Sequence, residues 1–208
     1  YGSGRELAIT VLAVPNVTSA AASKATVTAQ ETLTLTATTP VNGYCLTLYA
    51  EGGTKVKTWS CDGNSTVNGN VRTWKVQYAF GGTGDRRVTL KASADGVHCG
   101  GGKELAVTVL AVPNVTAAEF TGATVNRGEV LSIHVTAPAN GTCLHMYLEN
   151  GQLYRTWSSE GNSVVSGGNR FWNVSYSFSA AGARKLTFKV SADGVHVGAG
   201  MTASITVK

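Results

Sequence analysis

The strongest constraint in this sequence is a tandem repeat with a spacing of 98 residues. Residues 6–18 read ELAITVLAVPNVT and return as ELAVTVLAVPNVT at residues 104–116. Without any gap, residues 1–110 and 99–208 are identical at 56 of 110 positions. Self-similarity of this length means that the chain folds as copies of one structural unit. The 208 residues contain two full copies and 12 further residues.

The further residues indicate where each unit begins. Residues 1–6 align with residues 99–104, which lie inside a unit and not at its start. We therefore expect residues 1–13 to be the last strand of a preceding repeat, followed by repeat 1 at residues 14–111 and repeat 2 at residues 112–208. This organisation predicts a longer array of such units.

The segments that join the units are apolar and contain no flexible Gly/Ser tract. The connection Leu110–Pro113 reads LAVP, which predicts a semi-rigid rod of units rather than loosely tethered ones. Residues 6–12 alternate like an edge strand but lack a unit of their own. We expect this segment to pair with an exposed edge of a neighbouring molecule, by strand exchange, or to stay disordered.

Apolar and polar side chains alternate through most of each unit, which is the pattern of half-buried β-strands. Residues 74–80 (WKVQYAF) and 88–92 (VTLKA) show this pattern in the first copy. The composition is 43% hydrophobic and 14% charged, so the chain has apolar material for a core and too little charge for disorder. In the first copy we expect strands near residues 17–29, 32–38, 45–50, 55–60, 71–80, 86–94 and 97–110.

About seven strands per unit predict an all-β chain of two tandem β-sandwiches of immunoglobulin-like or fibronectin-III-like type. The pairs Asp95-Gly96, Asp193-Gly194 and Asn150-Gly151 supply the positive φ of tight turns. A two-residue turn at Asn150-Gly151 would place Trp157 opposite Leu144, facing the core. A loop longer or shorter by one residue would turn Trp157 outward.

With the strands placed, three stretches of the first copy show a resemblance. Residues 57–59 (KTW), 72–76 (RTWKV) and 91–96 (KASADG) resemble the tandem Ig-like repeats of large bacterial cell-surface and secreted proteins. The resemblance covers both units. It implies a non-catalytic extracellular or cell-surface module that spaces or presents the neighbouring domains of a parent protein, with no catalytic residue and no cofactor.

The four cysteines, at positions 45, 61, 99 and 143, show no spacing typical of a zinc site. Cys61 and Cys99 are both replaced in the second copy, whereas Cys45 is kept as Cys143, which suggests that Cys61 and Cys99 pair. Strand order instead makes Cys45 the nearer neighbour of Cys61 across a hairpin. We therefore expect Cys61 to form a disulfide with either Cys99 or Cys45.

Aromatic side chains are the candidate ligand-binding residues. Trp59 and Trp157 fit either a core position or an exposed platform, and the core is favoured because Trp is usually buried. Tyr49, Tyr147 and Tyr154 extend a candidate exposed strip beside them. An exposed patch of these five residues would indicate the alternative function, a carbohydrate- or protein-binding module for adhesion.

That alternative would bind a glycan, a cell-wall polymer or a protein through the loop pole at residues 42–43, 61–63 and 95–99. In this pole one Asp is followed three positions later by one His, and the second copy repeats the pair. One Asp and one His are too few ligands for a metal, so the Asp is expected to make a turn. His134 and His145 replace threonines of the first copy and are expected to face solvent.

Other classes of function are disfavoured. The sequence has no Gly-x-Ser-x-Gly elbow and no Asp-x-Asp calcium loop, so we expect no enzyme, no metal and no cofactor. The net charge of +5 is shared between the two copies and forms no basic arm for nucleic acid. No apolar run approaches the roughly 18 residues of a membrane span, so the chain is not expected to be membrane-embedded.

Overall fold

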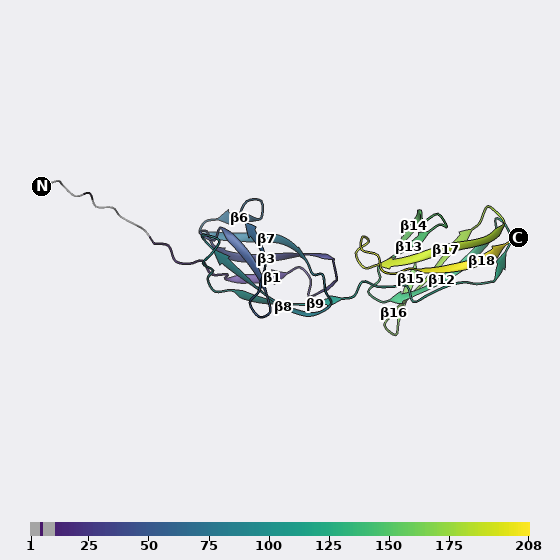
Figure 1. Cartoon of the computed structure of the whole chain (residues 1–208), viewed down its shortest axis with the longest axis horizontal. Helices are drawn as coiled ribbons and strands as arrows, with labels where there is room; N and C mark the ends of the chain where they lie inside the picture. The colour runs from purple at the N-terminus through teal and green to yellow at the C-terminus, as the bar shows by residue number, and fades with distance from the viewer. Residues whose placement is uncertain (1–4, 6–10) are drawn as a thin grey trace. The chain divides into compact units, whose positions relative to one another are not determined.

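The computed structural model describes residue 5 and residues 11–208 of the chain. It divides into two compact units, the first made up mainly of the chain up to Leu110 and the second mainly of Ala111–Lys208. Both units are built from β-strands, with no helix among the described residues (Figure 1). The predicted all-β class with two tandem β-sandwiches is confirmed. Of the segment predicted to exchange strands, residues 6–10 lie outside the described residues, and residues 11 and 12 are in no strand.

The first sandwich consists of a four-stranded and a five-stranded sheet. The four-stranded sheet has the order β1 (Ser19–Ala22), β3 (Thr32–Pro40), β7 (Val71–Ala79) and β6 (Ser65–Asn68). The five-stranded sheet has the order β2 (Thr26–Thr28), β9 (Lys103–Leu110), β8 (Gly84–Ser93), β4 (Cys45–Ala50) and β5 (Lys55–Ser60). This is the immunoglobulin arrangement, with one additional strand on each outer edge of the second sheet.

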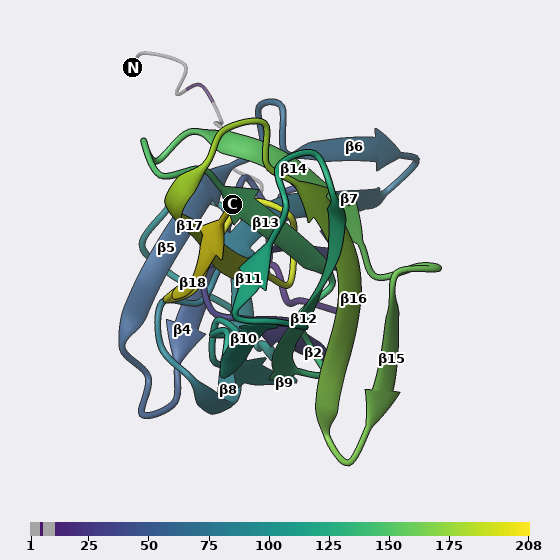
Figure 2. The ribbon, with the colours of Figure 1, turned by 90° about the vertical axis from the view of Figure 1, so that its right-hand side faces the viewer.

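The second sandwich repeats this strand order. Its four-stranded sheet contains β10 (Ala117–Phe120), β12 (Val130–Pro138), β16 (Asn169–Ser177) and β15 (Ser163–Ser166). Its five-stranded sheet contains β11 (Thr124–Val125), β18 (Met201–Val207), β17 (Gly182–Ser191), β13 (Cys143–Tyr147) and β14 (Leu153–Ser158). Figure 2 shows the hairpin of β15 and β16.

Each sandwich has nine strands, two more than predicted. The strand predicted at residues 17–29 is two strands, because the chain leaves the four-stranded sheet after β1 and joins the other sheet at β2. The edge strand β6 was not predicted, because its side chains are largely exposed and show no apolar alternation. The strand predicted at residues 97–110 begins only at Lys103, after a loop.

The hairpin of β13 and β14 has a register that the turn alone would not produce. Its loop is residues 149–151, one residue longer than the predicted turn. A β-bulge leaves Tyr154 as an extra residue on β14 and restores the register, so Leu144 lies opposite Trp157, the pairing expected for a two-residue turn and not for this longer loop. The first copy has the same loop length and the same bulge, with Val56 as the extra residue.

The two cores differ in how they satisfy their central tryptophan. Trp74 is fully buried, and its indole N–H donates to the Thr39 hydroxyl at 3.2 Å. Trp172 is also buried, but its indole nitrogen has no partner among the described residues. The second copy has Ala137 in place of Thr39. The second core is therefore closed by apolar packing at a point where the first core makes a hydrogen bond.

The variant Thr39→Val tests the contribution of that hydrogen bond. Valine has nearly the same shape but no acceptor, so the buried indole N–H of Trp74 would lose its partner. We expect the free energy of unfolding of the first sandwich to fall by about 1–3 kcal/mol. Amide hydrogen exchange resolves the two sandwiches separately, and the second serves as the internal control. Unchanged protection of β7 amides would contradict the assignment.

Candidate functional site

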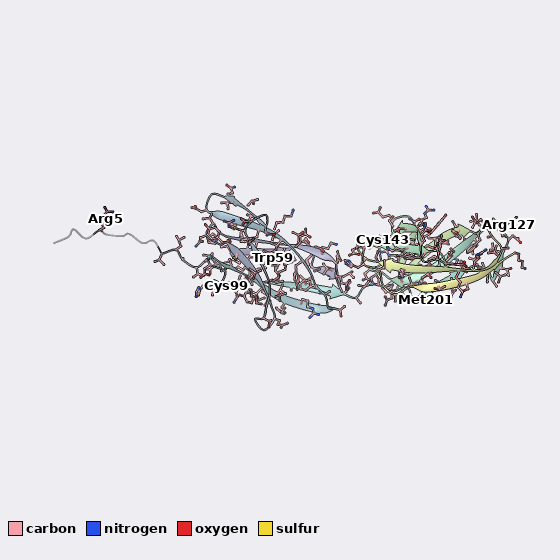
Figure 3. The ribbon with its side chains drawn as sticks, turned by 45° about the horizontal axis from the view of Figure 1, so that its top comes forward. Arg5, Trp59, Cys99, Arg127, Cys143 and Met201 are labelled. Carbon is pink, nitrogen blue, oxygen red and sulfur yellow. The ribbon has the colours of Figure 1, made fainter. Side chains whose placement is uncertain are left out.

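The two tryptophans proposed as ligand platforms lie in the cores. Trp59 is 8% exposed and Trp157 is 7% exposed, and Figure 3 labels Trp59 within the first sandwich. The outer side of each ring is covered by a cation, Lys57 at 5.3 Å and Arg155 at 5.2 Å from the ring centroids. Both tryptophans therefore occupy the core position that the sequence favoured, and the alternative of an exposed platform is not realised, because the bulged hairpin directs both rings inward.

The three candidate tyrosines do not form one strip. Tyr49 and Tyr147 are half-buried, and each ring centroid lies 5.2 or 5.3 Å from the ammonium nitrogen of a lysine on the neighbouring strand. Tyr154 is 53% exposed and contacts Tyr176 of the opposite sheet, with ring centroids 5.1 Å apart. Of the five candidate aromatics, Tyr154 is the one that offers a large exposed ring.

All four cysteines are free, so the disulfide predicted for Cys61 is not formed. Ser93 on β8 pairs with Cys45 on one side and with Cys99 on the other. Strands about 4.8 Å apart place the Cα atoms of Cys45 and Cys99 about 10 Å from each other. Cys61 follows the outer strand β5 and lies farther from Cys99. A disulfide requires Cα atoms within about 7 Å.

The pairing of Cys61 with Cys45 is prevented by the register of the two segments. The backbone N–H of Cys61 donates to the carbonyl of Tyr44 at 2.9 Å, so Cys61 lies opposite Tyr44 and one position away from Cys45. Neighbouring positions along a strand point to opposite faces of the sheet. Cys45 and Cys61 do lie on or beside neighbouring strands, as the strand order predicted. Their register, however, directs the two side chains to opposite faces of the sheet.

Asp95 closes the loop of the pole on itself. Its Oδ1 accepts the backbone N–H groups of Val97 at 2.9 Å and His98 at 2.8 Å, and its Oδ2 lies 2.6 Å from His98 Nδ1. The ring hydrogen bond, followed by the two backbone ones, holds the pKa of Asp95 well below its ordinary value. Asp193 and His196 repeat the geometry. The described residues contain no group of three His, Cys, Asp or Glu side chains able to hold a metal.

His145 is buried, contrary to the sequence prediction, whereas His134 is exposed as expected. The two ring nitrogens of His145 each lie 2.9 Å from a hydroxyl, that of Thr156 on one neighbouring strand and that of Ser191 on the other. His134 and His145 both lie at positions that face away from the core, so the apolar alternation predicted that their side chains would be exposed to solvent. The flanking side chains cover the imidazole, and this burial lowers the pKa of His145.

The second sandwich holds the segment that enters it, residues 111–116, which we call the connector. The Asn140 amide donates to the carbonyl of Ala111 at 3.1 Å. The Asn114 side-chain oxygen accepts the N–H of Ala199 at 2.7 Å, and the ring of Pro113 is buried. Residues of the two loops at the pole therefore fix the connector from both sides.

The first sandwich holds its own entering segment, residues 13–18, in the same way. The Asn42 amide donates to the carbonyl of Ala13 at 2.9 Å, and the Asn16 side-chain oxygen accepts the N–H of Gly101. Both anchoring asparagines belong to Asn-Gly pairs, at 42–43 and 140–141, and the first pair lies in the loop pole expected from the sequence. Their role in holding the chain that precedes each unit was not predicted, because it depends on contacts between loops distant in sequence.

A glycine makes this close approach of backbones possible in both copies. A Cβ atom on Gly198 would collide with the carbonyl oxygen of Pro113. A Cβ atom on Gly100 would collide with the carbonyl oxygen of Pro15 in the same way. The entering segment therefore packs directly against the loop backbone, with no room for a side chain between them.

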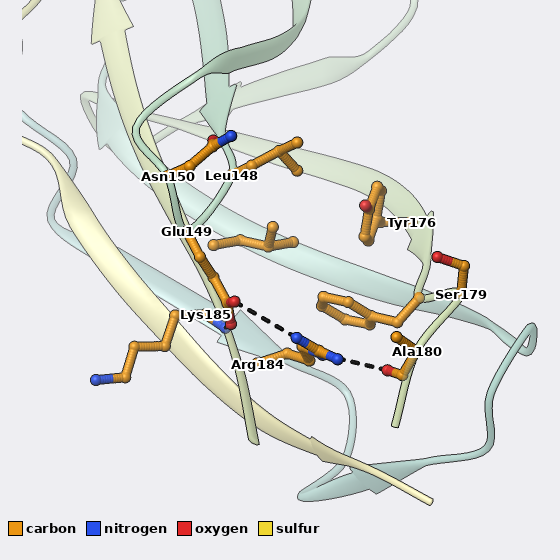
Figure 4. A pocket seen from close by; sticks show the side chains of 10 residues that line it. Leu148, Glu149, Asn150, Tyr176, Ser179, Ala180, Arg184 and Lys185 are labelled. Atoms are coloured by element: carbon orange, nitrogen blue, oxygen red, sulfur yellow. Dashed lines mark hydrogen bonds and ion pairs between the residues drawn. The ribbon is translucent and has the colours of Figure 1, made fainter. Parts of the chain in front are cut away.

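A shallow hollow lies in each sandwich at the end opposite its own entering segment, residues 13–18 in the first and 111–116 in the second. In the second sandwich it has a volume of about 290 Å³ and is lined by residues of the β13–β14 loop, the end of β16 and the start of β17 (Figure 4). In the first sandwich the equivalent positions line a hollow of about 360 Å³. Each hollow is lined by a tyrosine, a phenylalanine and an arginine at equivalent positions of the two copies.

No protein-family model matches this sequence, and no curated protein matches it. Similar solved structures include the fibronectin(III)-like modules of Clostridium thermocellum CbhA, at 14% identity over 91% of this chain and 94% of that one, with a TM-score of 0.39. An I-band fragment of titin, I67–I69, is 12% identical over 95% and 67% of the chains (TM-score 0.41). The D0-D1 domain of intimin is 16% identical over 92% and 98% (TM-score 0.33).

These likenesses carry no argument about what the chain does, and the fold assignment rests on its own strand order. That order confirms that the chain has the predicted fold of tandem immunoglobulin-like or fibronectin-III-like repeats. The described residues also include no helix long and apolar enough to cross a membrane.

The buried imidazole of His145 predicts that the second sandwich loses more stability in mild acid than the first. Because the folded pKa is lowered, the unfolded state binds the proton more readily. The stability from the neutral ring is complete above the unfolded value of about 6.5 and is lost as pH falls through the folded pKa. Amide exchange at pH 7.5 and pH 5 measures this difference for each sandwich.

The matched control is His145→Thr, which introduces the residue of the first copy, Thr47. This variant should remove the additional loss of stability of the second sandwich between the two pH values. The Asp-His loops occur in both copies, so their contribution largely cancels in the comparison. An equal loss in the two wild-type sandwiches would count against a role for His145.

Proposed function

We propose that this chain is a non-catalytic spacer segment of a larger bacterial extracellular or cell-surface protein, where it presents neighbouring domains. The observation that carries the proposal is the anchored connector. β9 of the first unit ends at Leu110, and the carbonyl of the next residue, Ala111, already accepts a hydrogen bond from Asn140 of the second unit. No free residue therefore remains between the last strand and the first anchored group.

An anchored connector suits a module that holds its neighbouring domains in fixed positions. A flexible Gly/Ser linker changes its direction at little cost, because it has no fixed contacts. Here a change of direction at residues 111–116 must break hydrogen bonds made by Asn140 and Asn114 and expose the ring of Pro113. Equivalent hydrogen bonds anchor residues 13–18 to the first unit. Their recurrence supports the view that anchoring the entering segment is a property of each repeat.

The distribution of side chains supports the same function. Both units use all four tryptophans inside their own cores, and the polar groups of the pole mainly satisfy one another. A ligand at this pole would have to displace the Asp95 and Asp193 contacts described above. The alternative of a binding module that uses the loop pole is therefore not favoured.

The extracellular or bacterial surface location is supported by the sequence resemblance to tandem Ig-like surface repeats. Neighbouring domains of the parent protein are the expected partners of the two units. Free thiols do not conflict with this location, because the register of the strands keeps the cysteines apart in any compartment.

The test of the spacer function is ¹⁵N relaxation of the whole chain. In the wild type we expect both units to report one slow rotational correlation time. The double variant Asn114→Ala/Asn140→Ala should free the connector and shorten the correlation time of each unit. The matched control is Asn16→Ala/Asn42→Ala, which releases residues 13–18 and should leave both values unchanged. Independent tumbling of the wild-type units would refute the proposal.

A further inference from the structure

The hollow of the second sandwich differs from its counterpart in ways that suit a ligand. It is lined by the aromatic rings of Tyr176 and Phe178. Glu149 and Arg184, whose side chains are partly exposed, form its charged rim (Figure 4). Tyr154, the bulged residue of β14, stands beside it against the ring of Tyr176. The hollow thus combines aromatic surface with a charged rim within about 290 Å³.

The charged rim is held in position before any ligand arrives. Arg184 donates to the carbonyls of Ala180 at 3.2 Å and Ala181 at 2.7 Å, and its Nη1 lies 3.6 Å from Glu149 Oε2. The other oxygen of Glu149 accepts the N–H of Lys185 at 2.8 Å. A carboxylate has about four acceptor sites, so Glu149 keeps capacity for further donors. Rigid polar groups of this kind bind with little loss of conformational entropy.

The aromatic surface is also ordered. Tyr154 meets Tyr176 edge to face at 5.1 Å, and Tyr176 meets Phe178 in the same geometry at 4.8 Å. These contacts fix the ring of Tyr154 while half of it stays exposed. Fixed, half-exposed tyrosine rings are good binding surfaces, because they combine apolar area with few rotatable bonds.

The first sandwich lacks the features that complete the site. Its hollow has Val56 at the position of Tyr154 and Gly82 at the position of Ala180. Arg86, the counterpart of Arg184, donates to the carbonyl of Thr83 at 2.8 Å and makes no ion pair among the described residues. Among the described residues, only the second hollow therefore has both an ion pair between two of its lining residues and, against its lining residue Tyr176, the exposed ring of Tyr154.

We propose that the hollow of the second sandwich binds one pyranose unit of a polysaccharide, with Tyr154 against the sugar ring and Glu149 and Arg184 at its hydroxyls. A pyranose has an apolar C–H face and an edge of hydroxyl groups that both donate and accept. An aromatic ring beside an adjacent acceptor and donor matches both parts. The proposal goes beyond the spacer function and does not depend on it.

The test is binding of the full chain to an array of defined neutral, amino and acidic hexose oligosaccharides. We expect retention on a subset of these sugars, and Tyr154→Ala should weaken it by about tenfold or more, as for loss of a central aromatic anchor. Tyr154→Phe keeps the ring and should keep most of the binding. The matched control is Val56→Ala, which truncates the same position of the first sandwich.

A ¹⁵N titration with the retained sugar then locates the site. Chemical shift changes should concentrate at residues 148–154 and 176–186 and should be smaller in Glu149→Gln. Retention of no sugar, retention unaffected by Tyr154→Ala, or shift changes centred on the connector would each overturn the proposal. The relaxation test of the spacer function involves no sugar, so the two proposals fail separately.

Discussion

The register of the β13–β14 hairpin, copied in β4–β5, is the constraint on which most of the molecule depends. Its three-residue loop alone would turn Trp157 to the outside, and the bulge at Tyr154 corrects the register by one residue. The correction completes the core around Trp157. It also leaves Tyr154 without a cross-strand partner on β13. The ring of Tyr154 instead contacts Tyr176, which lines the hollow. One local irregularity thus produces both a closed core and an exposed aromatic ring.

The duplication provides a comparison inside one chain. Features shared by both copies, such as the anchoring asparagines and the Asp-His loops, belong to the architecture of the unit. Features of one copy show where the same architecture tolerates change. His145 replaces a threonine between two hydroxyl groups, and Ala137 removes the acceptor of a buried indole. The proposed sugar site belongs to this second class, since its aromatic ring occurs in one copy.

The two ends of the second sandwich therefore have different chemistry. At the connector, hydrogen-bond groups are used to fix the chain, which favours transmission of position. At the opposite end, Glu149 and Arg184 are fixed but retain exposed surface and bonding capacity. A spacer that carries a weak sugar contact at one end would combine both properties without any change of fold.

The sequence by itself determined the duplication, the all-β class and the sandwich type, because period-two alternation and a 98-residue repeat are local or self-referring patterns. The position of Trp157 opposite Leu144 depended on a bulge that no such pattern predicts. Only the tertiary structure decided which side chains share a face across three or four strands. It separated Cys61 from Cys45 and Cys99, covered His145, and placed Asn140 on the connector. These outcomes depend on strand order, bulges and loop contacts between distant segments, for which single-residue patterns carry no signal.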